Sequence, residues 1–273
     1  ALTVDVLAAR ATLTDLQVWP FLDWDEEGDC MIDVARITLQ GSPFFEPDRA
    51  RLRIAAHGLT FPAACLPPDG RAALAGVGLF DIDLSYAAAD IDYHVPSAGA
   101  DVSVRATAPG FAAADIAARF DYLWFEADEE MEDPLPVAFL ESAALGVEDL
   151  GGWAAIAALL PPQVTDPGSA ALLVEGGLGT ALLEMSGGSE AGATLTPQQR
   201  EFIDGAVAAW TAFLTEQGRL ELRTGIPAGE AVYLDPAWGD DPEEAFAELA
   251  PVLAHGDAGS EGQVAIGALR AAL

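Results

Sequence analysis

The feature that most constrains the fold is a two-residue alternation of apolar and polar side chains through the first 126 residues. In 79–86 the apolar or aromatic members are Phe80, Ile82, Leu84 and Tyr86. In 116–125 they are Ile116, Ala118, Phe120, Tyr122 and Trp124. A period of two is the spacing of strands that bury one face. The pattern predicts an antiparallel sheet with one face toward water.

The apolar positions change between even and odd numbers partway along three of these segments. The changes fall between Val34 and Ile37, between Ile54 and Leu59, and between Tyr86 and Ile91. A shift of one residue would turn the core side chains to the wrong face, unless a bulge absorbs it, and bulges bend a sheet. We therefore predict long, curved strands with bulges. The alternative for the third segment is a hairpin that turns at 87–89.

The character of the sequence changes near residue 131, where the acidic break "EEMEDPLP" precedes a region rich in Ala, Leu and Gly. In 196–217, Thr196 as N-cap and Gln199 as its capping-box partner predict a helix. A second helix is expected to start at Asp241. Strands are expected in 219–226 and 230–234, and as a pair that turns at Gly176-Gly177 within 170–186.

These patterns together predict an α+β protein with a long, curved antiparallel sheet that helices from the C-terminal half partly cover. The expected parts are a β-rich half, 1–130, and a mixed half, 131–273, that completes the same sheet. Hydrophobic residues make up 51% of the chain, which is enough for a sizeable core. No run of apolar residues is long enough for a transmembrane helix.

The charge of the chain limits its partners. There are 44 acidic and 12 basic residues, a formal net charge of −32. Nucleic acid and anionic lipid surfaces would be repelled, which argues against nucleic acid as a partner. Cys30 and Cys65, the two cysteines, form either one disulfide or two buried thiols, and we predict the disulfide. Together with a start at Ala1 instead of Met, a disulfide favours an exported protein.

The stretch "DWDEEGDC" resembles the start of a calcium-binding loop. Asp23, Asp25, Glu27 and Asp29 alternate along it, and hard cations prefer several carboxylate oxygens on a short turn. However, Val34 lies where such a loop places its bidentate Glu. Two interpretations therefore stay open, a non-standard calcium site or a solvated acidic turn. No other cofactor is predicted.

Two further groups of residues could carry chemistry. Asp81 and Asp83, then Asp90, Asp92 and His94, would share strand faces, where they could bind a cation or, for the acids, supply a glycosidase-like carboxylate pair. Ser260 in "AGSEG", with His255 nearby, is one change from a nucleophile-elbow motif. Both groups also fit an ordinary acidic surface and an ordinary loop.

Aromatic side chains occupy both faces of the strand "FDYLWFE". If one face packs on the core, the other must be covered by the helices of the second half, by an apolar ligand or by a partner. Phe120, Tyr122, Trp124 and Phe125 are therefore candidate ligand-binding residues.

The segments "ARITLQG", "RLRIAAHGLTF" and "GLFDIDLSYAAADIDYHV", with "RLELRTGIPAGEAVYL" and the capped "DPEEAFAELAPVL", resemble exported alphaproteobacterial proteins of unknown function in the broad AsmA-like group. The resemblance covers about 60% of the chain. It implies a curved sheet of repeated strands, a periplasmic location and a lipid-facing groove. It carries over no functional residue.

The first functional hypothesis is a non-enzymatic cell-envelope protein that holds an apolar, lipid-like ligand or an envelope protein partner on a curved sheet. The second is a hydrolase that acts through carboxylates or Ser260. The third is a scaffold or adhesion module that calcium stabilises.

Overall fold

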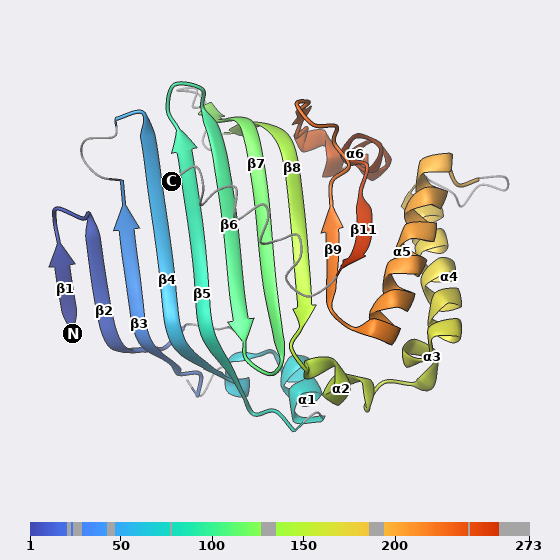
Figure 1. Cartoon of the computed structure of the whole chain (residues 1–273), viewed down its shortest axis with the longest axis horizontal. Helices are drawn as coiled ribbons and strands as arrows, with labels where there is room; N and C mark the ends of the chain where they lie inside the picture. The colour runs from blue at the N-terminus through green and yellow to red at the C-terminus, as the bar shows by residue number, and fades with distance from the viewer. Residues whose placement is uncertain are drawn as a thin grey trace. The chain divides into compact units, whose positions relative to one another are not determined.

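The structure, a computed structural model, describes residues 1–20, 23, 29–42, 47–76, 78–126, 135–185, 194–239 and 241–256 (Figure 1). Within these residues, eleven strands form an antiparallel sheet in which β1 to β9 are neighbours in chain order, β11 pairs with β9, and β10 pairs with β8. The predicted α+β class and antiparallel sheet are confirmed. Contacts divide the chain into two compact units, 1–117 with 150–159, and 118–149 with 160–273.

The first unit is an antiparallel meander in which each strand pairs with the next one along the chain. Its strands are β1 (Leu2–Asp5), β2 (Arg10–Val18), β3 (Ile32–Gly41), β4 (Arg49–Pro62), β5 (Asp81–His94), β6 (Gly99–Ala108) and the first part of β7 (Ala112–Glu126). Its helices are η1 (Ala63–Cys65), α1 (Pro68–Gly76) and α2 (Gly152–Ala157). Because β5 is continuous, the alternative of a hairpin at 87–89 is wrong.

One unpaired residue interrupts each of four adjacent strands at the same level. The four are Asp15, Ala35, Gly58 and Ser85, and the register is unchanged beyond them, since Thr14 pairs with Arg36 and Leu16 with Val34. Asp15 and Gly58 have positive φ angles of 56° and 59°. We call these four positions the kink row. It explains the change of parity, because one extra residue on each strand keeps the apolar side chains on one face.

The kink row corrects one detail of the sequence interpretation. Tyr86 was grouped with the apolar positions of β5, but it pairs with His57 and Thr107 in a polar row. The change in β5 therefore falls between Leu84 and Ala87, at Ser85. The changes expected between Val34 and Ile37 and between Ile54 and Leu59 are confirmed at Ala35 and Gly58.

A disulfide joins Cys30 to Cys65 across 35 residues, as predicted. Both cysteines are almost fully buried. Val34, which lies on β3 four residues after Cys30, is buried as well. The bond ties the segment before β3 to η1, which follows β4 directly. It therefore closes the end of the first unit that lies beyond the kink row.

The second unit combines the last part of β7 and four further strands with most of the helices. The strands are β8 (Leu135–Asp149), β9 (Arg219–Arg223), β10 (Val232–Tyr233) and β11 (Val252–Gly256). The helices are α3 (Pro162–Thr165), α4 (Pro167–Met185), α5 (Pro197–Glu216), η2 (Pro236–Gly239) and α6 (Pro242–Leu249). Helix α5 packs against β9, β11 and α4, and it buries Ile203, Ala206, Ala209 and Phe213.

The two helices predicted from capping signals are confirmed. Thr196 Oγ1 accepts a hydrogen bond from the Gln199 backbone N–H at 3.2 Å, and the Gln199 side chain accepts one from the Thr196 N–H at 2.8 Å. Asp241 caps α6 by accepting from the Glu244 N–H at 3.1 Å. In the described part of the chain, no helix has the length and apolar character needed to cross a membrane.

The prediction of two strands in 170–186 is wrong, because this segment lies in α4. Its many Ala and Leu residues favour a helix, and packing against α5 accompanies the burial of Ala170 and Leu182. The glycines that suggested a turn lie on open surface, since a Cβ added at Gly176 or Gly177 would meet no atom within 4 Å. Tertiary packing thus overrides the local turn signal.

Replacing both glycines with alanine, Gly176→Ala and Gly177→Ala, should stabilise the protein by about 1 to 2 kcal/mol, since each Gly in a helix costs roughly 0.5 to 1 kcal/mol relative to Ala. Thermal unfolding followed by circular dichroism would show the gain as a higher midpoint. Gly110→Ala is the control, because Gly110 also faces open space but has a φ of 73°, and there alanine should destabilise. A lower midpoint for the double variant would contradict the helical assignment.

Candidate functional site

One face of β1–β6 consists of three rows of apolar side chains. The cross-strand pairing gives the rows Val4, Ala11, Leu39, Ile54, Ala89 and Val104; Leu2, Leu13, Ile37, Ala56, Ala87 and Ala106; and Leu52, Ile91 and Val102. We call this surface the apolar face. Neighbouring strands lie about 4.8 Å apart, so the six strands span roughly 24 Å.

The apolar face is in contact with solvent. Leu52 is 45% exposed, and Ile54, Ile91 and Val104 are each more than 40% exposed. An antiparallel sheet normally buries its apolar face, and contiguous exposed apolar surface of more than a few hundred Å² marks a binding site. The apolar face is therefore the main candidate site in the first unit.

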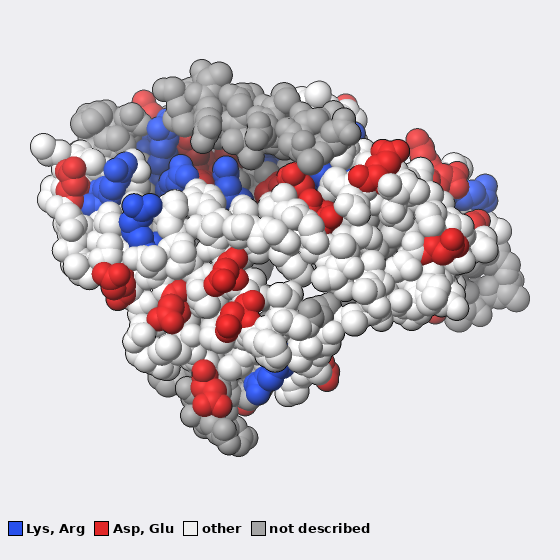
Figure 2. Space-filling view, turned by 60° about the horizontal axis from the view of Figure 1, so that its bottom comes forward, with Lys and Arg blue, Asp and Glu red and all other residues white. Residues whose placement is uncertain are grey.

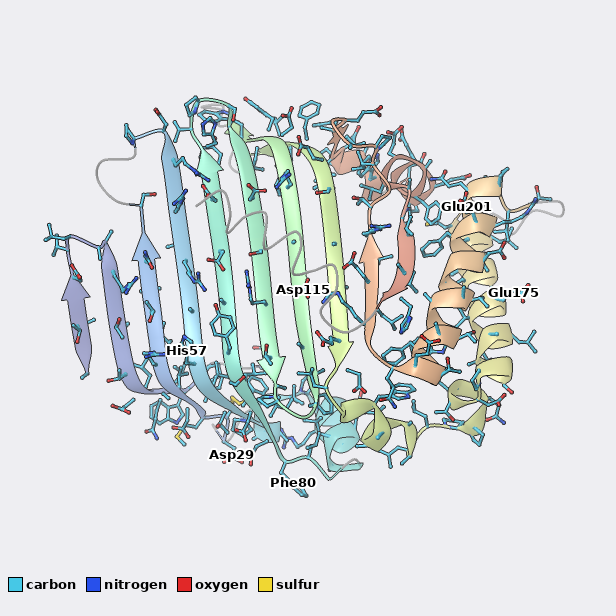
Figure 3. All side chains as sticks on the ribbon, in the orientation of Figure 1. Asp29, His57, Phe80, Asp115, Glu175 and Glu201 are labelled. Atoms are coloured by element: carbon cyan, nitrogen blue, oxygen red, sulfur yellow. A yellow bond between two sulfur atoms is a disulfide. The ribbon has the colours of Figure 1, made fainter. Side chains whose placement is uncertain are left out.

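The apolar face continues beyond the kink row, where Leu16, Leu59 and Leu84 are half-buried and Val18 is 42% exposed. Leu16, Val34, Leu59 and Leu84 continue the pairing there, and Val34 is only 3% exposed. This is the end that holds the disulfide, near Asp29 and Phe80 in Figure 3. Burial at this end is therefore concentrated at Val34 and the disulfide.

The opposite face of the same strands carries half of the basic residues of the chain. The six are Arg10, Arg36, Arg49, Arg51, Arg53 and Arg105, and we call this surface the arginine face. Figure 2 shows blue side chains gathered at the upper left of the view, with red ones below them. In a chain with 44 acidic residues, such a concentration of positive charge needs a physical explanation.

Two of the β5 acids that were candidate cation ligands, Asp90 and Asp92, pair with arginines. Asp92 accepts hydrogen bonds from both Arg49 Nη2, at 2.6 Å, and Arg51 Nε, at 3.1 Å. Asp90 pairs with Arg53 at 3.4 Å and lies 4.0 Å from Arg105. The described residues contain no group of His, Cys, Asp and Glu side chains that could hold a metal ion.

Arg53 connects the acids to an aromatic pair. Its Nη2 donates to Tyr86 Oη at 2.6 Å, and the Tyr86 ring lies 5.1 Å from the His57 ring. Burial of Arg53 lowers the pKa of its guanidinium, but the hydrogen bond to Tyr86 and the charges of Asp90 and Tyr86 raise it by more. The net pKa lies above the ordinary value, so Arg53 stays charged.

The proposed calcium loop lies mostly outside the described residues. Asp23 and Asp29 are described and exposed, whereas Asp25 and Glu27 are outside the described ranges. The calcium site therefore stays a prediction.

The candidate aromatic residues on β7 belong to an exposed cluster in the second unit. Tyr122 is 37% exposed and Trp124 53%, and Phe120 is half-buried. The side chain of Phe125 is outside the described part. The Tyr122 ring lies 6.4 Å from Phe139 on β8, which lies 5.4 Å from Tyr233 on β10. Sequence reasoning missed Phe139 and Tyr233, because neither stands in an aromatic-rich stretch.

The Ser260–His255 contact proposed for a hydrolase lies outside the described part of the chain. Ser260 is outside the described residues, and His255 contacts the backbone carbonyl of Gln217 through its Nε2. A different Ser–His contact joins His94 Nδ1 to Ser97 Oγ at 2.7 Å, at the turn between β5 and β6. Ser97 Oγ also accepts from the Gly99 N–H at 3.3 Å, and the group is exposed. This contact stabilises a turn.

The clearest site features are present in the sequence, but a single strand does not reveal them. "RARLRI" in β4 places Arg49, Arg51 and Arg53 on one face and Leu52 and Ile54 on the other. Only the pairing with β3 and β5 shows that both sets continue across the sheet. Comparisons with family models, with curated proteins and with solved structures found no match to this chain.

Proposed function

We propose that the protein is a non-enzymatic, exported protein that binds a lipid-like ligand on the apolar face of β1–β6. The observation that carries the proposal is the set of three apolar rows whose central residues, Leu52, Ile54 and Ile91, are more than 40% exposed. The disulfide fits an oxidising compartment, in agreement with export.

The energetics favour an apolar occupant. Covering about 300 Å² of apolar surface contributes roughly 7 kcal/mol before the costs of association are subtracted. The net charge of −32 disfavours docking on an anionic membrane, because the whole protein would be repelled from it. Individual acyl chains are therefore better suited to this face than an intact bilayer surface.

A charge placed on the apolar face should abolish most of the binding. Leu52→Asp should weaken the binding of N-phenyl-1-naphthylamine, a neutral apolar dye, by about tenfold or more, since the ligand would have to bury an unpaired carboxylate. Dye fluorescence gives the affinity. Displacement of the dye by lysophosphatidylcholine would show that a lipid occupies the same place.

Leu173→Asp on α4 is the matched control, since it makes the same substitution at a leucine that is 52% exposed and lies outside the sheet. Its dye affinity should stay within about twofold of the original protein. Both variants should unfold at nearly the same temperature as the original, because neither leucine is buried. Equal dye binding by Leu52→Asp and the original protein, or no binding by either, would refute the proposal.

A further inference from the structure

One row of the arginine face contains several hydrogen-bond donors and no carboxylate. Across β2 to β6 it consists of Thr14, Arg36, His57, Tyr86 and Thr107, joined by cross-strand pairing. The sequence neighbours of its members belong to the apolar face: Ile37 follows Arg36, Ala56 precedes His57, and Ala87 follows Tyr86. Successive residues of a strand point to opposite faces, so this row lies on the other side of the sheet from the lipid-binding surface.

Arg36 is the central cation of this row. It is exposed and, within the described ranges, it has no hydrogen bond or ion pair. Its direct neighbour on β4 is His57, which is labelled in Figure 3 and directly precedes Gly58 of the kink row. Directly opposite side chains on a sheet have Cβ atoms about 5 Å apart, so both side chains can reach one small ligand.

Tyr86 adds a third donor. Its hydroxyl oxygen accepts from Arg53, so the hydroxyl hydrogen is left to donate to another group. The nearest acids on β5 are engaged, since Asp90 pairs with Arg53 and Asp83 accepts from Thr60 at 2.7 Å. Asp33 on β3 accepts from Gln17 at 3.0 Å. The row therefore offers guanidinium, imidazole and hydroxyl donors without a carboxylate of its own.

We propose that Arg36, His57 and Tyr86 form a binding site for a phosphate group. A guanidinium binds phosphate oxygens through two parallel hydrogen bonds, and the imidazole and phenol can donate to the remaining oxygens. The phosphate belongs either to a free phosphate ion or to a diester such as a lipid headgroup. The rest of the chain is negatively charged and does not attract a phosphate over long range. Binding therefore depends on direct contacts with these donors.

The test is isothermal titration calorimetry with inorganic phosphate and, separately, with glycerophosphocholine as a soluble diester, at about 20 mM salt, where screening is weak. Binding of phosphate alone identifies a free-ion site, and binding of the diester identifies a headgroup site. Arg36→Gln should weaken the binding by about tenfold, the effect of one lost charge-assisted contact. Tyr86→Phe should weaken it by a smaller factor, since one neutral donor is lost.

Arg223→Gln is the matched control, because Arg223 is an exposed arginine on β9 in the second unit. It removes the same charge and should leave the affinity unchanged within about twofold. An equal loss in Arg223→Gln and Arg36→Gln would mean that only net charge matters, and it would overturn the site. Absence of binding by the original protein would overturn it as well. Neither result affects the dye experiment, which probes the other face.

Discussion

Removing the disulfide, by Cys30→Ala together with Cys65→Ala, should lower the unfolding midpoint by on the order of 10 °C. The bond closes a loop with a sequence separation of 35, and the chain-entropy estimate for such a loop is roughly 4 kcal/mol. One kcal/mol corresponds to about 2 to 4 °C in a protein of this size. Both cysteines are buried, so their replacement also removes packed side-chain atoms.

Reduction of the original protein is the control for the loss of side-chain volume. With dithiothreitol it should unfold at nearly the temperature of the double variant, and the double variant should not respond to the reductant. Differential scanning calorimetry in both conditions measures the four midpoints. A midpoint of the original protein that reductant leaves unchanged, with free thiols verified, would show that the bond does not stabilise the fold.

Gly225→Ala is expected to destabilise the second unit by about 1 to 3 kcal/mol, the usual range for overpacking. A Cβ at this position would lie 2.5 Å from the Ala250 carbonyl oxygen and 3.2 Å from the Ala250 Cβ. The Gly225 N–H donates to the Leu249 carbonyl at 3.0 Å, so the two backbone segments are held together where the clash occurs. Because the obstacle is backbone, no rotamer change relieves it.

Urea unfolding followed by circular dichroism measures this effect. Gly239→Ala is the matched control, since a Cβ there meets nothing within 4 Å and its φ is not positive. Its midpoint should stay close to that of the original protein. If Gly225→Ala were equally stable, the close approach of the segment after β9 to the end of α6 would be wrong.

The parts of the fold that depend on local signals were predictable. Thr196, Gln199 and Asp241 mark helix starts because their side chains satisfy backbone N–H groups within the same turn. The parity changes at Ala35 and Gly58 were visible because alternation is a property of each strand alone. The error in α4 has a different origin, since the Ala- and Leu-rich flanks and the packing against α5 together keep Gly176 and Gly177 helical despite their turn signal.

The candidate sites were less predictable, because they depend on pairing between strands. Leu52 and Arg53 are unremarkable as single residues of β4. Their meaning comes from Ile91 and Asp90, which lie nearly forty positions further along the chain and face them across the ladder. The pairing of Asp90 and Asp92 with arginines likewise changes the interpretation of two acids that, as a sequence pattern, suggest a cation site.

The kink row has a consequence for how this sequence can change over time. Its four residues keep β2, β3, β4 and β5 in phase with one another on both sides of the interruption. Deleting one residue from a single strand would shift the register of that strand, on one side of the deletion, relative to both neighbouring strands. The lengths of the four segments are thus tied together, and insertions or deletions are tolerated only in the connecting loops or in all four strands at once.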